Sequence, residues 1–177
     1  MDELLIKRYQ NGDHAAFKQL YELNAASALR LARVITREDG LAADAVQEAF
    51  LRAFIYRHKL RQGARFDLWF YRIVVNESRR ILGKNKLHVL SEIPHDAASA
   101  EDSYAFLQYE ALYASLEQLP EILRTALGLK YIHGLSEAEI ANVLGINKNT
   151  VKSRLFQARR KLKTMIQGNE GLIHEQV

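Results

Sequence analysis

The chain has 177 residues, 48% of them hydrophobic and 26% charged, with a formal net charge of +4 and no cysteine. The lack of cysteine excludes a disulfide framework and a thiolate metal site, and no apolar run reaches the roughly 20 residues of a membrane-spanning helix. With only two prolines and no recognisable signal peptide, we expect an all-α protein of the cytoplasm that consists of two small helical domains.

Residues 1–83 are predicted to form the first domain. Asp13 is a suitable N-cap for a helix that passes through Phe17, Leu20 and Tyr21. A further helix over about 41–57 carries small and aromatic residues at three- and four-residue spacing, which predicts one buried stripe. The residues of this stripe are Ala42, Ala45, Val46, Ala49, Phe50, Ala53 and Phe54.

The opposite side of the helix over 41–57 predicts a surface for a protein partner. Aliphatic and acidic residues lie together there, a combination typical of a protein interface. On periodicity alone, packing of Leu51 and Ile55 against the next helix is an equally good interpretation. The residues on this side are Asp44, Gln47, Glu48, Leu51 and Ile55.

The segment 66–82 is predicted to be a helix with aromatic, basic and amide side chains along one edge. Such an edge suits single-stranded nucleic acid, because rings and guanidinium planes stack on unpaired bases while cations hold the backbone. Burial in the core is a strong alternative for Phe70, and the two interpretations are balanced for Trp69 and Tyr71. The edge consists of Arg65, Trp69, Arg72, Asn76, Arg79 and Arg80.

Residues 84–103 are predicted to be a flexible linker, because the helical pattern stops there and the segment is polar and acidic, with one proline. Beyond the linker we expect a second domain over 104–166 and a short tail over 167–177. The second domain should begin with helices over about 104–116 and 120–132.

Two helices joined by a turn at Gly145 are predicted to close the second domain. Ser136 and Glu139 form a capping box for the first of these helices, and Asn147 can cap the second. This arrangement is typical of a helix-turn-helix. The buried stripe of the second helix is predicted to be Val151, Leu155, Ala158 and Leu162.

The other face of this last helix combines cations with side chains that can contact base edges in a major groove. Because residues 146–166 contain seven Lys or Arg and no acidic residue, we predict that the helix binds DNA. Phe156 lies outside the buried stripe, and it either packs on a neighbouring helix or contacts a thymine methyl group. The residues on this face are Lys148, Asn149, Lys152, Ser153, Phe156, Gln157 and Arg159.

Four pieces of sequence occur in order along the chain. The first runs from Gly12-Asp13 through Ala16-Phe17 to Leu20-Tyr21, and the others are DAVQEAFLRAF at 44–54, WFYRIVVN at 69–76 and LSEAEIANVLGINKNTVKSRLFQARRKL at 135–162. In this order they resemble the extracytoplasmic-function sigma factors of bacterial RNA polymerase. The resemblance implies that the protein binds core RNA polymerase, directs it to promoter DNA, and has no catalytic chemistry or cofactor of its own. It also implies control by an anti-sigma factor.

The resemblance further implies a role for each predicted surface. The residues implied to bind the polymerase clamp are Asp44, Gln47, Glu48 and Leu51. The residues implied to engage the opened minus-10 strand are Trp69, Arg72, Asn76, Arg79 and Arg80. The residues implied to face the bases of the minus-35 duplex are Lys152, Ser153, Phe156 and Gln157. The residues implied to hold its phosphates are Lys148, Thr150, Arg154 and Arg159.

The sequence departs from the family pattern at three places. The loop LRQGARF at 60–66 lacks the usual order of an aromatic residue, an arginine and a glycine, so the position of a pocket for a flipped base stays open within it. Ala42 and Ala43 stand where an acidic residue often precedes Asp44. Gln157 stands where a basic residue is frequent, so a base preference does not transfer to this position.

Two other classes of function are alternatives. A polymerase-independent repressor or activator would use only the helix-turn-helix and would dimerise, but the sequence shows no heptad seam for a dimer. An enzyme acting on nucleic acid would need clustered carboxylates or histidines, and the six histidines do not converge on a metal-binding motif. We therefore expect no catalytic residue and no metal site.

Overall fold

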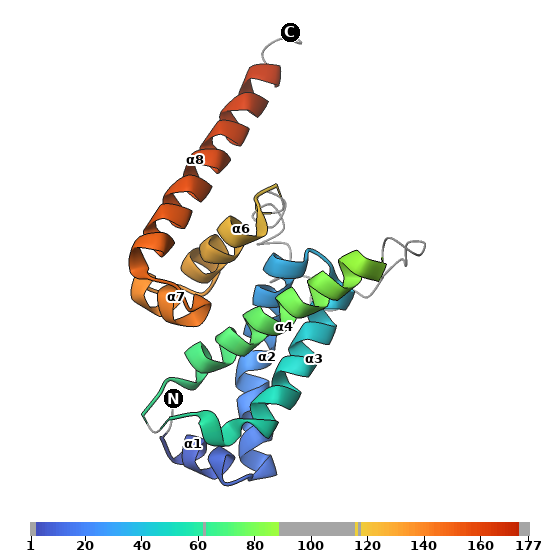
Figure 1. The fold of residues 1–177 in the computed structure, drawn as a ribbon, viewed down its shortest axis with the longest axis vertical. Helices are drawn as coiled ribbons and strands as arrows, with labels where there is room; N and C mark the ends of the chain where they lie inside the picture. Colours follow the sequence, from blue (N-terminus) through green and yellow to red (C-terminus); the bar gives the residue numbers. More distant parts are fainter. Residues whose placement is uncertain (1–2, 62, 89–115, 117, 174–177) are drawn as a thin grey trace. The chain divides into compact units, whose positions relative to one another are not determined.

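The computed structural model describes residues 3–61, 63–88, 116 and 118–173 (Figure 1). Every regular element that these residues form is helical, which confirms the predicted all-α fold. The chain divides into two compact units, the first made of residues 1–97 and 142–145, and the second made of residues 98–141 and 146–177. This division agrees with the expectation of two small helical domains.

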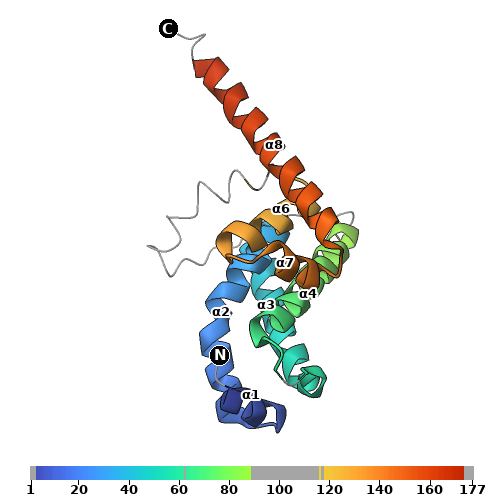
Figure 2. The same cartoon turned by 90° about the vertical axis from the view of Figure 1, so that its left-hand side faces the viewer.

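The first unit is built from helices that follow one another closely along the chain. Its elements are α1 (Glu3–Gln10), α2 (His14–Thr36), α3 (Asp39–Ile55), the 3-10 turn η1 (Arg57–Lys59) and α4 (Phe66–His88). The helices α2, α3 and α4 pack side by side, and α1 packs against α2 and η1 (Figure 1, Figure 2). The helix predicted over 41–57 is α3, and the segment 66–82 lies within α4.

The first turn of α2 is capped by Asp13, as predicted from the sequence. The Asp13 carboxylate accepts hydrogen bonds from the backbone N–H groups of Ala15 and Ala16, at 2.8 and 3.2 Å. Arg8 also pairs with this carboxylate, at 2.7 Å. These donors hold the pKa of Asp13 below its ordinary value, and the hydrogen bond from Arg8 is the largest cause. The cap therefore joins the last turn of α1 to the first turn of α2.

The core of the first unit combines small residues on α3 with an aromatic cluster. Phe50 and Phe70 have ring centroids 4.4 Å apart, and those of Phe66 and Phe70 are 5.5 Å apart. Tyr9 of α1 adds to the cluster, and its buried hydroxyl donates a hydrogen bond to the backbone oxygen of Ala53 at 2.5 Å. The buried members of the stripe predicted on α3 are Ala42, Ala45, Val46, Ala49, Phe50 and Ala53, whereas Phe54 is partly exposed.

The helix α4 is longer than the predicted first domain. We expect the linker to begin at residue 84, whereas α4 continues through Gly83 to His88. Gly83 does not have the positive φ of a helix-capping glycine, and a glycine inside a helix costs only about 1 kcal/mol. The rest of the predicted linker, over 89–103, lies outside the described residues, as does the helix predicted over 104–116 apart from its last residue.

The second unit is built around α8. Its elements are α6 (Glu121–Leu127), the π-helical turn η2 (Gly128–Ile132), α7 (Glu137–Leu144) and α8 (Lys148–Ile173). The elements α6 and η2 replace the single helix predicted over 120–132, and the change of hydrogen bonding begins at Gly128, where helix propensity is low. The helix α6 packs against α8. Buried residues of this unit include Leu116, Leu119, Leu123, Leu129, Ile140, Val151, Leu155 and Ala158.

The caps and the turn predicted around α7 and α8 are confirmed. The Ser136 N–H donates to Glu139 Oε2 at 2.8 Å, and the Glu139 N–H donates to Ser136 Oγ at 3.3 Å, which completes the capping box. The helix α7 ends before Gly145, whose φ of +64° favours glycine. Asn147 caps α8, because its side-chain oxygen accepts a hydrogen bond from the Thr150 N–H at 2.7 Å.

The helix α8 is also longer than expected. We expect the second domain to end at residue 166, whereas α8 reaches Ile173. No proline occurs within residues 167–173, and Gly168 and Gly171 weaken a helix by only about 1 kcal/mol each. Of the buried stripe predicted on α8, Val151, Leu155 and Ala158 are buried and Leu162 is partly exposed.

Candidate protein and nucleic-acid interfaces

The outer side of α3 presents aliphatic residues to solvent. The side chains of Leu51 and Ile55 are 54% and 58% exposed, so the alternative that they pack against the next helix is wrong. Their further burial in a partner would contribute on the order of 1 kcal/mol each. This α3 face consists of Asp44, Gln47, Glu48, Leu51 and Ile55, among which only Glu48 is partly buried.

The neighbouring helix α2 adds an aromatic residue that the sequence did not indicate. Tyr21 is half exposed, and its ring centroid lies 4.6 Å from that of Phe50 in α3. Sequence reasoning places Tyr21 only within the helix that Asp13 caps, and it does not indicate an accessible ring. Only the packing of α2 against α3 leaves the Tyr21 ring partly accessible beside Phe50.

Glu48 belongs to a network of ion pairs between α3 and α4. The Nε atom of Arg52 lies 3.1 Å from Glu48 Oε1 and 2.8 Å from Glu77 Oε1. The Nε atom of Arg80 lies 2.6 Å from Glu77 Oε2, and its Nη2 atom lies 3.6 Å from Glu48 Oε1. The structure thus brings Glu48 and Arg80 together, although sequence reasoning assigns them to separate surfaces. Arg52 and Glu77 were not singled out from the sequence, because helix packing creates their contacts.

One edge of α4 exposes polar and basic side chains, and this α4 edge consists of Trp69, Arg72, Asn76, Arg79 and Arg80. Arg72 and Asn76 are exposed to solvent. Trp69 is partly buried, and its ring centroid lies 5.9 Å from that of the buried Phe66. Arg79 and Arg80 are partly buried. The five predicted residues therefore differ in how much of each side chain can reach a ligand.

Two aromatic residues of α4 belong to the core instead of the edge. Phe70 is fully buried, which confirms the core interpretation of this residue. Tyr71 is also buried, and its hydroxyl lies 2.8 Å from Ser27 Oγ, so its interpretation as a base-stacking residue is wrong. Arg65, which precedes α4 and was predicted on the same edge, forms an ion pair with Asp67.

The loop over 60–66 is anchored at both ends. Leu60 is buried, and its backbone oxygen accepts a hydrogen bond from Gln10 Nε2 at 2.6 Å. At the other end, Phe66 is buried in the aromatic cluster. Residue 62 lies outside the described residues. A pocket for a flipped base within this loop therefore stays a prediction.

The outer side of α8 carries cations, polar groups and one aromatic ring. Phe156 is 61% exposed, so the alternative that it packs on a neighbouring helix is wrong. Gln157 Nε2 donates a hydrogen bond to Ser153 Oγ at 3.1 Å, which orients these two side chains relative to each other. The exposed residues of this α8 face are Lys148, Asn149, Lys152, Ser153, Phe156, Gln157 and Arg159. Its partly buried residues are Thr150 and Arg154.

Two members of the α8 face contact residues of neighbouring turns. Thr150 Oγ1 donates to the capping oxygen of Asn147 at 3.0 Å. Arg159 Nη1 lies 3.4 Å from the hydroxyl of Tyr131, an exposed residue of η2. Sequence reasoning missed Tyr131, because helical spacing does not reveal a π-helical turn. The tyrosine limits the orientations of Arg159 at the border of the face.

Acidic side chains of the described residues take part in ion pairs between helices. In this part of the chain, no group of three or more His, Cys, Asp or Glu side chains could hold a metal ion. The same residues include no helix that is long and apolar enough to cross a membrane. The carboxylates around α3 and α4 face guanidinium groups, and such pairs connect helices.

The chain matches two protein families along its length. The family described as "Sigma-70 region 2" matches residues 20–87, and the family described as "Sigma-70, region 4" matches residues 109–162. The chain is 32% identical to the RNA polymerase sigma-H factor of Pseudomonas aeruginosa, and the alignment covers 94% of each chain. It is also 32% identical to the ECF RNA polymerase sigma-E factor of Escherichia coli (strain K12), again over 94% of each.

Two solved structures have a similar fold. CnrH in complex with the cytosolic domain of CnrY has a TM-score of 0.73 and 24% identity, covering 94% of this chain and 97% of that chain. The sigma factor RpoE in complex with the anti-sigma factor NepR, from Bartonella quintana, has a TM-score of 0.73 and 23% identity, covering 85% and 96%. At these identities the two structures support the fold of the chain.

Proposed function

The chain belongs to the extracytoplasmic-function sigma factors of the sigma-70 family, and we propose that its three exposed faces make three separate contacts in promoter recognition. It binds core RNA polymerase and directs promoter-specific transcription initiation, and it is not an enzyme. One observation carries the proposal. A single chain exposes an aliphatic and acidic face on α3, a basic and amide edge on α4, and a face on α8 without any acidic residue.

The α3 face is proposed to bind the clamp of core polymerase. Leu51 supplies exposed apolar area at its centre, and Asp44 and Gln47 supply exposed polar groups beside it. A central apolar side chain with polar neighbours is the usual composition of a binding hot spot. Glu48 is proposed to take part as well, although its carboxylate also pairs with Arg52 inside the unit.

The α4 edge is proposed to engage the opened minus-10 strand. The partly exposed Trp69 side chain can stack on an unpaired base, and the exposed Asn76 amide can hydrogen-bond a base edge. The exposed guanidinium of Arg72 can hold the backbone, with further positive charge from Arg79 and Arg80. Arg80 is less available for a further contact, because it already pairs with Glu77.

The α8 face is proposed to recognise the minus-35 duplex. The first two turns of α8 follow the cap at Asn147. A recognition helix presents the residues of such amino-terminal turns to the major groove. The residues proposed to face bases are Lys152, Ser153, Phe156 and Gln157. The residues proposed to hold phosphates are Lys148, Thr150, Arg154 and Arg159.

We propose that the protein works as two domains on a linker, the first ending with α4 at His88 and the second ending with α8 at Ile173. An anti-sigma factor is the proposed regulator, since the similar structures of CnrH and RpoE each contain a second protein, in RpoE an anti-sigma factor. The proposed compartment is the cytoplasm, where core RNA polymerase acts on DNA.

The proposed function is tested by run-off transcription with core polymerase that lacks any other sigma factor. Genomic templates are transcribed with and without the protein. Discrete new start sites are expected, and their upstream sequences would give the promoter elements directly. Absence of transcripts, together with specific duplex binding by a dimer of the folded protein, would instead support a polymerase-independent repressor or activator.

A further inference from the structure

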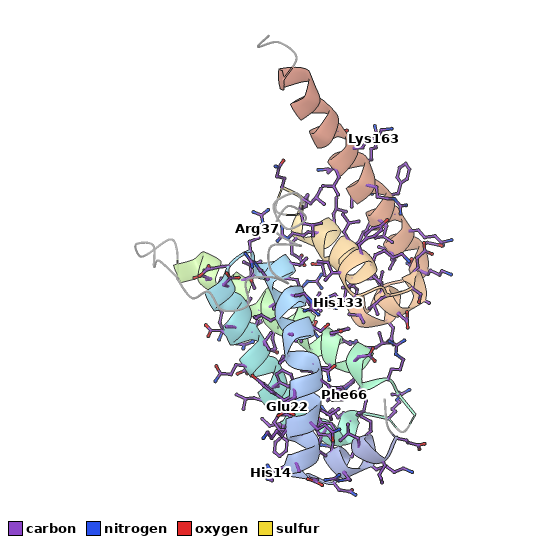
Figure 3. All side chains as sticks on the ribbon, turned by 180° about the vertical axis from the view of Figure 1, so that it is seen from behind. His14, Glu22, Arg37, Phe66, His133 and Lys163 are labelled. Atoms are coloured by element: carbon purple, nitrogen blue, oxygen red, sulfur yellow. The ribbon has the colours of Figure 1, made fainter. Side chains whose placement is uncertain are left out.

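The exposed cations of α8 continue beyond the residues proposed for minus-35 recognition. Lys152, Phe156, Arg159 and Lys163 follow one another at intervals of four, three and four residues, so they lie on one line along the helix. Arg160 lies beside this line, and all five side chains are exposed. Lys163 projects from α8 into solvent (Figure 3). We name Arg160 and Lys163 the distal cations.

The distal cations have no carboxylate within reach along the helix. Helical ion pairs form between residues three or four positions apart, and no acidic residue occupies those positions around Arg160 or Lys163. Arg160 and Lys163 are three residues apart, and Lys163 also lies four residues after Arg159. Like charges at such spacing destabilise an isolated helix. These cations therefore repel one another in the free chain, and a bound polyanion would compensate this repulsion.

The length of α8 determines which part of a DNA duplex these cations can reach. An α-helix rises about 1.5 Å per residue, so Arg160 and Lys163 lie about 12 and 16 Å along the axis from Lys152. The major groove is about 12 Å wide. When Lys152 faces base edges inside the groove, the distal cations stand near its border, where the sugar-phosphate backbone lies.

We propose that Arg160 and Lys163 bind phosphates of the duplex that flanks the minus-35 element. This inference rests on the proposed function, because it requires the α8 face to enter the major groove there. Phosphate contacts fix the position of a protein on DNA without selecting a sequence. The distal cations therefore increase affinity for every promoter to the same degree and lengthen the contacted duplex.

The experiment compares promoter binding by polymerase holoenzyme that contains the full-length protein or its variants, over a range of salt concentrations. Each lost phosphate contact makes the negative slope of log K against log salt shallower by about 0.9, so Arg160→Ala with Lys163→Ala should make it shallower by about 1.8. The ratio of affinities for different promoters should not change. The control is Lys161→Ala, which removes an exposed cation on the opposite side of α8 from Lys152 and should leave the slope unchanged.

A second measurement locates the contacted phosphates. Methylphosphonate linkages remove the charge of single phosphates, and they are placed one by one on either side of the minus-35 element. At each contacted position, the difference in affinity between the parent and the double variant should shrink to about half, because one of the two phosphate contacts is then already absent. A difference that stays the same at every position would overturn the inference.

A third variant separates failure of the inference from failure of the proposed function. If Lys152→Ala changes promoter choice while the double variant keeps the slope of the parent, the distal cations do not bind DNA, and an acidic protein segment becomes their expected ligand. If Lys152→Ala and the double variant both leave promoter binding unchanged, the assignment of the α8 face to the minus-35 element is itself wrong.

Discussion

Glu77 shows at the scale of one residue how α3 and α4 are held together. Its side chain is only 6% exposed, yet it carries a carboxylate. Arg52 from α3 and Arg80 from α4 lie 2.8 and 2.6 Å from its two oxygens, which offsets the cost of burial. Removing the carboxylate would leave two guanidinium groups close together without a shared partner.

The first prediction is that Glu77→Gln destabilises the first unit by about 1–3 kcal/mol in chemical denaturation. The loss should stay below the 3–5 kcal/mol of a fully buried pair, because Arg52 and Arg80 are about one-third exposed. The control is Glu22→Gln, which removes an exposed pair with Lys18 and should cost at most about 1 kcal/mol. Equal losses for the two variants would contradict the prediction.

The second prediction concerns Lys152, an exposed cation at the centre of the α8 face. If its ammonium contacts a base edge, Lys152→Ala should change the preference at one minus-35 position by about 1–3 kcal/mol. Competition between promoter variants for holoenzyme measures this preference. Equal weakening on every sequence would show that Lys152 holds a phosphate instead.

The short helix α7 shows at the scale of one element how much depends on a cap. The helix α7 has only eight residues. The N–H groups of its first turn have no backbone oxygen of the same helix to bond with, so they need side-chain partners. Ser136 and Glu139 supply these partners reciprocally. The helix that precedes the proposed recognition helix therefore begins at a defined residue.

The third prediction is that Ser136→Ala destabilises the second unit by about 1 kcal/mol, because one N-terminal N–H group loses its acceptor. Ser136→Asp should retain most of the stability, since an aspartate oxygen also caps helices well. Thermal unfolding followed by circular dichroism measures both variants. A loss as large for the aspartate as for the alanine would show that capping is not the cause.

The fourth prediction is a pH dependence that arises at the start of α2. Arg8 and the backbone N–H groups of Ala16 and Ala15 lower the pKa of Asp13 below its ordinary value of 3.8. A carboxylate with a lowered folded-state pKa stabilises the fold above the unfolded pKa, and this contribution is lost as the pH falls through the folded-state pKa. Thermal unfolding between pH 6 and about pH 2 should therefore show a smaller acid-induced loss for Asp13→Asn than for the parent.

At the scale of the whole molecule, the proposed contacts are distributed over both compact units. The α3 face and the α4 edge belong to the first unit, and the α8 face belongs to the second. Two linked binding modules gain affinity when a common partner fixes both, since the second contact becomes intramolecular. By fixing both units, polymerase should combine the weak DNA contact of the α4 edge and that of the α8 face into one strong promoter complex.

The fifth prediction is that Leu51→Lys weakens binding to core polymerase by about 2 kcal/mol or more, because the change places a charge at the centre of the α3 face. Binding of a minus-35 duplex by the same chain should not change. Leu23→Lys is the control, because Leu23 is 61% exposed on α2 and lies outside the α3 face. Leu51 is a better choice than Glu48, since a lysine at position 48 would also repel Arg52 and Arg80.

Leu51→Lys should fail to assemble with core polymerase in gel filtration, whereas Leu23→Lys should assemble like the parent protein. Circular dichroism should be the same for both, since both replaced side chains are largely exposed. Normal assembly of Leu51→Lys would remove the α3 face from the proposed clamp contact.

The sequence by itself determined where α7 and α8 begin and where the turn between them lies. The capping box at Ser136, the positive φ at Gly145 and the cap at Asn147 depend on hydrogen bonds and backbone angles within one or two turns. Local residue order is therefore sufficient to predict them. The buried stripes of α3 and α8 follow from helical periodicity in the same way, and the exposed faces lie opposite these stripes.

Only the tertiary structure decided which side chains are accessible on those faces. Leu51 stays exposed and Tyr71 becomes buried because of where the neighbouring helices lie, whereas periodicity indicates only which side of one helix is apolar. The ion pairs that Arg52 and Arg80 form with Glu77 likewise require α3 to pack against α4. Burial and charge pairing depend on distances through space, and the residue order within a single helix does not specify those distances.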